Sequence, residues 1–181
     1  MKDLISISKV EDIVPQYRGT PISLLLEYHN LRRVFDTYAN AQMLIGMCMD
    51  NRKHLHIPDN FAYIIRSGGA DLRKSEFKVS YAIAVGGVNT IALIGHNHCG
   101  MVNLEARREQ FIAGMVENAG WDRGQAEDHF ERFAPSFEIN HEVEFVKSEA
   151  KRLRAYYPKV TVAPMIYLVE DGLLYLVDEP Y

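Results

Sequence analysis

The sequence contains little cysteine: its 181 residues include only Cys48 and Cys99. Two cysteines in a chain of this length cannot build the disulfide framework on which small secreted domains depend. Reduced thiols that remain available to a metal are typical of the cytoplasm, so we expect a cytoplasmic protein. Both cysteines lie in short segments that follow apolar runs, and this concentration points to a metal site.

The sequence also lacks long apolar runs and an excess of positive charge. No run approaches the ~20 residues that cross a bilayer. The first six residues have neither the apolar core nor the small-residue cleavage site of a signal peptide. The formal net charge is -4, which argues against a polycationic surface for nucleic acid. We therefore expect neither a membrane nor a nucleic-acid partner.

Repeats, low-complexity tracts and linkers are absent as well, which predicts one domain over residues 1–181. Hydrophobic residues make up 48% and charged residues 24%, the balance of a globular domain with a real core. Several short apolar runs bounded by turn signals have the length of buried strands. These runs cover residues 43–47, 61–65, 90–94, 160–169 and 173–177.

The spacing of the runs predicts the fold class. Loops or helical patterns separate the first four runs, which predicts a parallel α/β sheet of about four strands with helices on both faces. Asp171-Gly172 is a hairpin signal, so the last run should add an antiparallel strand at an edge.

Helical patterns fill most of the remaining chain. We expect an N-terminal helical arm, consisting of an extended stretch over 1–24 and a helix over 25–40, before an α/β core over 43–181. Residues 101–156 should be mostly helical. A further helix is predicted over 73–85, with a shared apolar side made of Phe77, Tyr81, Ala84 and Val85.

Two segments carry groups capable of chemistry, and each follows a predicted strand. Cys48, Asp50 and Arg52 alternate after the first strand, so they share a face wherever the chain stays extended. At that spacing the arginine can pair bidentately with the carboxylate. His96 and Cys99 follow the third strand. Open α/β sheets bind ligands at the carboxyl ends of strands, so the two segments converge if these strands are neighbours.

The H-x-x-C spacing of His96 and Cys99 lets a turn wrap both residues around one metal. His98 is the alternative ligand, because it would share a face with His96 on a continuing strand; the flanking glycines favour the turn and therefore His96. Two thiolates and one imidazole suit zinc and leave one tetrahedral position open, as catalytic sites do. On the cysteines alone, small buried hydrophobic residues would be the simpler interpretation.

These motifs resemble those of the beta-class carbonic anhydrases, and in particular the compact microbial branch of that family. The family has C-x-D-x-R after its first core strand and H-x-x-C after its third, read here as Cys48 to Arg52 and His96 to Cys99. Arg66-Ser67-Gly68-Gly69 is similar to the Arg-Asn-Ala-Gly-like loop between them. Ser67 and Gly68 depart from the usual Asn and Ala, in a loop that lines the pocket in relatives.

The resemblance implies a role for each motif residue. Cys48, His96 and Cys99 would ligate Zn²⁺, while Asp50 and Arg52 would form the catalytic dyad. The implied activity is that of a lyase, the reversible hydration of carbon dioxide to bicarbonate by a zinc-bound hydroxide.

The resemblance also implies a homodimer or a dimer of dimers, with the N-terminal arm embracing the partner subunit. Two other functions stay open. One is hydrolysis of carbonyl sulfide or carbon disulfide on the same scaffold. The other is a non-catalytic, zinc-binding regulatory protein.

Overall fold

The computed structural model describes residues 3–179 and contains one mixed six-stranded sheet, in the order β1-β6-β5-β4-β2-β3. Strands β5, β4, β2 and β3 run parallel, with β3 at one edge of the sheet, and β6 pairs antiparallel with β5. A two-residue strand, β1, pairs with the outer side of β6, so β6 is not the outermost strand as predicted. The strands are β1 Leu4–Ile5, β2 Met43–Cys48, β3 Ala62–Ser67, β4 Thr90–His96, β5 Thr161–Tyr167 and β6 Leu174–Val177.

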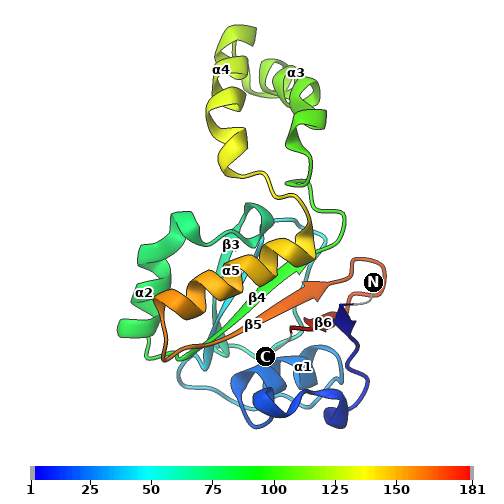
Figure 1. Cartoon of the computed structure of the whole chain (residues 1–181), viewed down its shortest axis with the longest axis vertical. Coiled ribbons are helices and arrows are strands. Elements are labelled where there is room, and N and C mark those ends of the chain that lie inside the picture. The colour runs from blue at the N-terminus through cyan, green and yellow to red at the C-terminus, as the bar shows by residue number, and fades with distance from the viewer. Residues whose placement is uncertain (1–2, 180–181) are drawn as a thin grey trace.

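Helices cover both faces of the sheet, as predicted (Figure 1). The α-helices are α1 Pro21–His29, α2 Glu76–Ala84, α3 Arg108–Ala119, α4 Arg123–Phe133 and α5 Glu142–Tyr156. Short 3₁₀ helices lie at Val10–Asp12, Pro15–Tyr17, Gly68–Ala70, Arg73–Ser75, Leu104–Arg107 and Ala134–Ser136. Within the described part of the chain, no helix is both long and apolar enough to span a bilayer.

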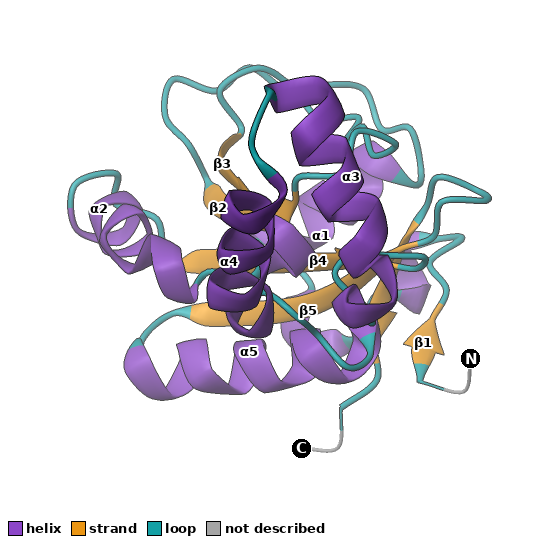
Figure 2. Ribbon diagram, turned by 90° about the horizontal axis from the view of Figure 1, so that it is seen from above, coloured by secondary structure: helices purple, strands orange, loops and turns teal. Residues whose placement is uncertain are grey.

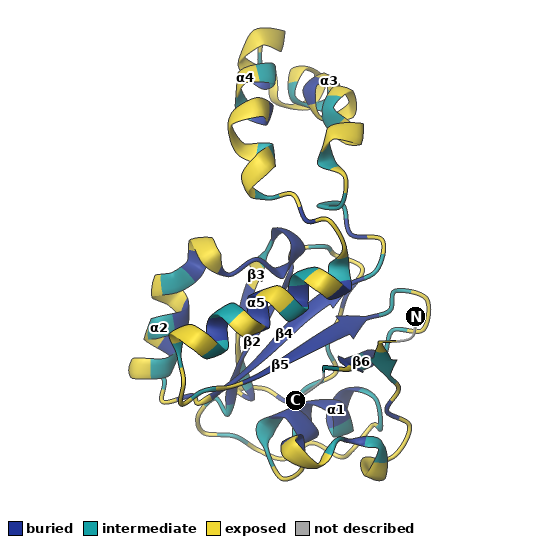
Figure 3. Ribbon diagram, viewed as in Figure 1, coloured by how far each residue is buried: buried dark blue, intermediate teal, exposed yellow. Residues whose placement is uncertain are grey.

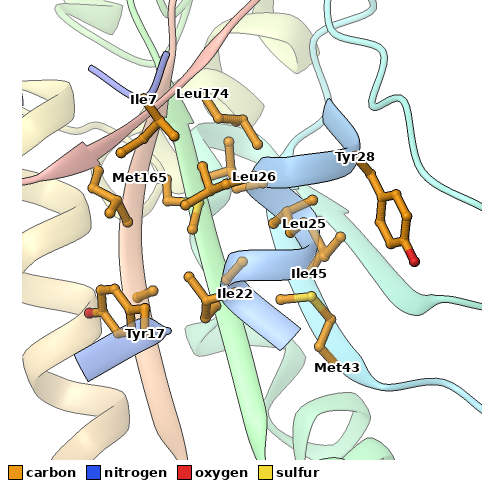
Figure 4. Packing of buried hydrophobic residues seen from close by; sticks show 14 of the residues in the cluster. Ile7, Tyr17, Ile22, Leu25, Leu26, Tyr28, Met43, Ile45, Met165 and Leu174 are labelled. Carbon is orange, nitrogen blue, oxygen red and sulfur yellow. The ribbon is translucent and has the colours of Figure 1, made fainter. Parts of the chain in front are cut away.

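Strand alternation divides the core into two layers. One face of β2 carries Met43, Ile45 and Met47, which pack with α1 and the N-terminal arm. Leu44 points to the other face, where α2 and α5 form the second layer. Figure 2 shows α1 and α5 on opposite sides of β4 and β5. The close-up in Figure 4 shows Ile22 and Leu26 of α1 over the strands, together with Ile7 and Met165.

The helix predicted over 25–40 is wrong in its bounds, because α1 begins at Pro21 and ends at His29. Thr20 caps the helix by accepting a hydrogen bond from the Ile22 amide, and proline suits the first helical position. Residues 31–40 form a loop instead. Arg32 lies there in the left-handed region with φ 57°, which a continuing helix does not permit.

The predicted extended arm packs on its own sheet. Ile7, Ile13 and Tyr17 are buried in the same layer as α1. Residues 1 and 2 of the predicted arm lie outside the described residues. The arm thus completes one face of the core within a single chain.

The helix predicted over 73–85 is shorter, and the side that it buries is not the shared side named from the sequence. A 3₁₀ turn occupies Arg73–Ser75 before α2, and Val79 and Ala82 are the α2 residues that reach the core. Phe77, Tyr81 and Val85 share a side, as predicted, but that side faces solvent. Helical spacing identified a shared side without indicating which side the sheet covers.

Helices α3 and α4 form a hairpin that stands beyond the end of the sheet (Figure 1). Gly120 ends α3 with φ 72°, and the Asp122 carboxylate caps α4 by accepting from the Gln125 amide. Most of the hairpin surface is exposed (Figure 3). Ile112, Ala126 and Phe130 are its buried apolar positions.

His29 ties the end of α1 to two distant loops. Its Nδ1 lies 3.0 Å from the His56 amide and accepts that hydrogen bond, so Nε2 carries the proton and donates to the Gly172 carbonyl at 2.8 Å. Burial lowers the pKa of His29 to about 4, against 6.5 for a free imidazole. A second proton would also displace the His56 amide from Nδ1. The folded state therefore requires a neutral His29.

This pKa shift predicts a loss of stability in acid. The folded-state pKa is lowered, so the unfolded chain binds the proton first as pH falls below 6.5, and the loss is complete near pH 4. Between pH 7 and pH 4.5 the free energy of unfolding should fall by about 2 kcal/mol more than in His29→Gln. Urea denaturation at both pH values measures the difference, and equal losses in the two proteins would contradict it.

Candidate metal centre

The two predicted segments meet at one edge of the sheet. Strands β2 and β4 are parallel neighbours, with Met47 opposite Ile94. Cys48 is the last residue of β2 and His96 is the last residue of β4. The condition for the two segments to converge is therefore met, and the carboxyl ends of these strands bring a thiol and an imidazole to the same place.

A turn after β4 brings Cys99 back toward His96. His98 adopts the left-handed conformation with φ 54°, which reverses the chain direction. The Cys99 amide donates to Glu142 Oε1 at 3.2 Å, which fixes the turn to the start of α5. Gly95 lets α5 pack close to the end of β4, because a Cβ at this position would lie 2.8 Å from Val146 Cγ1 of α5.

Cys48, His96 and Cys99 are all buried, and they offer three ligand atoms within 4.8 Å of one another. The two Sγ atoms are 3.9 Å apart, far beyond the ~2.04 Å of a disulfide bond. Two thiolates bound tetrahedrally at ~2.3 Å would be about 3.8 Å apart. The spacing of the thiols therefore fits a zinc ion.

The His96 ring is oriented as a metal ligand requires. Nδ1 lies 2.8 Å from the Asn97 carbonyl oxygen and donates to it, so the lone pair is on Nε2. Nε2 is buried and, among residues 3–179, is the one buried side-chain nitrogen or oxygen without a hydrogen-bond partner. Buried polar atoms rarely lack a partner, and a metal would supply one.

Asp50 and Arg52 form the bidentate pair that their spacing predicted. Arg52 Nε lies 3.0 Å from Oδ1 and Nη2 lies 2.7 Å from Oδ2, while the Arg52 amide also donates to Oδ1. Nη2 donates further to the His98 carbonyl, which links the two segments. Asp50 Oδ2 is 3.9 Å from His96 Nε2, so the carboxylate stands beside the candidate ligands.

The charges around the site shift two pKa values downward. Hydrogen bonds from Arg52 hold the pKa of the Asp50 carboxyl well below its usual range. The hydrogen bond with Cys99 lowers the pKa of the Cys48 thiol, and the nearby Lys53 ammonium contributes. The same contact raises the pKa of Cys99. One thiolate of the pair is therefore favoured without a metal, and a divalent cation would favour both.

Sequence reasoning missed Lys53. Its side chain is fully buried, and Nζ lies 3.2 Å from the Asp50 carbonyl and 3.7 Å from Asp50 Oδ1. Burial lowers the pKa of Lys53. A lysine one residue past the motif carries no signal of burial in the sequence, because lysine is normally exposed.

Arg66 was recognised only as part of a loop, although it fixes the segment after β2. Its guanidinium donates to the carbonyl oxygens of Cys48, Asp50 and Lys53, at 3.3, 3.5 and 3.2 Å. Its place near the end of β3 could have indicated this, since β3 was predicted to lie in the same sheet.

His98 lies outside the cluster of candidate ligands. Its ring points to solvent and its Nε2 is 2.9 Å from Glu170 Oε1, with both side chains exposed. The turn conformation that brings Cys99 inward directs this ring outward. The structure thus separates the two histidines that sequence spacing left as alternatives.

Comparison with solved structures shows the same fold in several proteins. A carbonic anhydrase from Streptococcus mutans is 18% identical with TM-score 0.59, over 92% of this chain and 100% of that one. A beta-carbonic anhydrase from Trichomonas vaginalis is 17% identical with TM-score 0.61, over 83% and 91%. The apo form of a carbon disulfide hydrolase is 20% identical with TM-score 0.52, over 89% and 90%.

A search of curated protein sequences gives no match. The family model described as carbonic anhydrase, in contrast, matches residues 46–174, well over half of the chain and including both motif segments. The sheet, the two segments at its edge and this match agree: the chain belongs to the beta-class carbonic anhydrase family.

Proposed function

We propose that this protein catalyses the zinc-dependent, reversible hydration of carbon dioxide to bicarbonate. The observation that carries the proposal is the unpartnered Nε2 of His96, which lies with two free thiols beside an ionised Asp50–Arg52 pair. A purely structural zinc site has four protein ligands, whereas within residues 3–179 the cluster of converging ligand atoms has three members. A site with three protein ligands and an adjacent carboxylate suits catalysis.

Cys48, His96 and Cys99 would hold the zinc ion. When bound, zinc lowers the pKa of a water from 15.7 to about 7 and so supplies the nucleophile that attacks carbon dioxide. Asn97 keeps the His96 ring in the tautomer that presents Nε2, because its carbonyl accepts from Nδ1.

Asp50 would orient the nucleophile. Arg52 holds the pKa of this carboxyl well below its usual range, so Asp50 stays ionised and can only accept a hydrogen bond. For the same reason Asp50 cannot store the proton that hydration releases, and that proton leaves by another group or by buffer. Arg52 also fixes the direction of the carboxylate through two parallel hydrogen bonds.

Lys53 and Arg66 would stabilise the site without binding the metal: Lys53 balances its negative charge and Arg66 holds its backbone. The buried Lys53 ammonium offsets the negative charge of Asp50 and of the cysteine pair. Arg66 holds the backbone of the segment with three carbonyl contacts, so Cys48 and Asp50 keep a fixed relative position.

The homodimer and the cytoplasmic location remain predictions.

Hydrolysis of carbonyl sulfide or carbon disulfide is a second candidate, because the same residues would serve it. The likeness to the carbon disulfide hydrolase fits this candidate, because that protein has the same fold. Parallel assays of carbon dioxide hydration and of sulfide release from carbon disulfide separate the two. Faster sulfide release would replace the first proposal with the second.

Substitution of the candidate ligands should remove the metal. We expect Cys48→Ser, Cys99→Ser and His96→Ala to lose stoichiometric zinc, because each leaves only two good ligands. His98→Ala is the matched control and should keep it, since that ring points away from the cluster. Metal analysis of the purified proteins tests this. Loss of zinc in His98→Ala with retention in His96→Ala would reverse the assignment.

Neutralising the Asp50 carboxylate should affect the hydration of carbon dioxide but not the binding of zinc. Asp50→Asn is expected to keep zinc but to lower hydration by about 10–100-fold, because an amide cannot replace an ionised acceptor. Stopped-flow measurement with a pH indicator gives the rate. Asp59→Asn, an exposed position in the same loop, is the control.

Measurements of zinc content and activity together distinguish an enzyme from a non-catalytic, zinc-binding regulatory protein. If the unmodified protein binds stoichiometric zinc but neither hydrates carbon dioxide nor releases sulfide from carbon disulfide faster than the Cys48→Ser variant, both catalytic candidates are ruled out. A non-catalytic zinc-binding role would then stand.

A further inference from the structure

An aromatic cavity of about 290 Å³ lies between the α3–α4 hairpin and the loops of the metal centre. Side chains from both helices and from the two motif loops line it, and they include Phe111, Phe130, Phe133, Phe137, Met49 and Met101. His129 is the one polar side chain in its lining, and its ring packs against Phe133 at 4.7 Å between centroids. The cavity therefore offers almost only apolar contacts.

Met101 forms the wall between this cavity and the candidate metal ligands. It packs against the buried cluster of Cys48, Cys99 and Ile139, and it also lines the cavity. Met49, which directly follows Cys48, lines the cavity from the other segment. A flexible, unbranched side chain thus separates the cavity from the two thiols.

The absence of a side chain at Gly68 lets Met101 pack closely against this loop. Gly68 lines the cavity, and a Cβ at this position would lie 3.0 Å from Met101 Sδ and 3.6 Å from Phe137 Cδ1. A larger residue at this position would have to displace Met101. Gly68 is also where this sequence departs from the family's usual Ala.

The surroundings of the cysteine pair are chemically different on two sides. Met101 and the cavity are apolar, whereas Asp50, Arg52 and Lys53 form a charged cluster. An apolar cavity favours an uncharged molecule and penalises an anion that cannot find hydrogen bonds. The partly exposed Arg52 side suits the charged product.

We propose that the cavity between α3–α4 and Met101 is a binding site for the uncharged, linear triatomic substrate before it reaches the metal centre. Carbon dioxide and its sulfur analogues belong to this class. The proposal rests on the proposed function for the identity of the ligand, while the cavity itself can be tested without activity.

Xenon tests the binding site directly, because it is uncharged and occupies apolar cavities. Crystals of the zinc-loaded protein, pressurised with xenon, should show a xenon atom among Phe111, Phe133 and Met101. No xenon at this place would overturn the proposal. A cavity filled by a side chain from a second copy of the chain would overturn it as well.

Filling the cavity tests its role in turnover. Ala134 lines the cavity and Ala113 lies exposed on α3 outside it, so Ala134→Phe and Ala113→Phe make a matched pair. Ala134→Phe should raise KM for carbon dioxide about tenfold, as expected for lost apolar contacts, with kcat within about twofold. Ala113→Phe should leave both unchanged. Ala134→Leu, a smaller change, should give an intermediate KM if the larger variant folds poorly.

Zinc content and binding of thiocyanate to the cobalt-substituted protein are measured on every variant. A KM effect with unchanged metal and anion binding supports the proposal, while unchanged KM in Ala134→Phe and Ala134→Leu overturns it. If the unmodified, zinc-loaded protein lacks hydration activity, the proposed function fails instead. The xenon result then decides alone whether the cavity binds apolar molecules.

Discussion

Parallel hydrogen bonding between β2 and β4 sets Met47 opposite Ile94, and this register leaves Cys48 and His96 at the same edge of the sheet. A slip of one residue would turn every side chain of β2 to the opposite face. Both apolar layers oppose such a slip, because Met43, Ile45 and Met47 fill one layer and Leu44 fills the other. The packing of the core therefore fixes the geometry of the candidate metal centre.

The candidate metal centre also requires that its buried charges be compensated. Two thiols, an imidazole and a carboxylate lie close together with little access to water, so their charges need partners. Arg52 pairs with Asp50 from the solvent side, and Lys53 approaches it from the interior. This arrangement keeps Asp50 ionised and holds its carboxylate in a fixed orientation beside the candidate ligands. It also explains how a lysine can be fully buried here.

The α3–α4 hairpin contributes little to the sheet's core, since most of its surface is exposed. Its buried apolar positions and aromatic side chains face one another and the loops of the metal centre, where they enclose the cavity beside Met101. The hairpin thus forms a cavity beside the site without supplying any of the candidate ligands. The two apolar layers of the sheet and the cavity under the hairpin are separate parts of this fold.

The sequence alone determined the parallel strands, the hairpin at Asp171-Gly172 and the motif residues, because strand alternation and turn chemistry are local. It could not determine that α1 ends at His29, that Phe77 faces solvent or that Lys53 is buried. Those outcomes depend on which surfaces the sheet covers. Only the tertiary structure separated His96 from His98, because one left-handed residue directs Cys99 inward and the neighbouring ring outward.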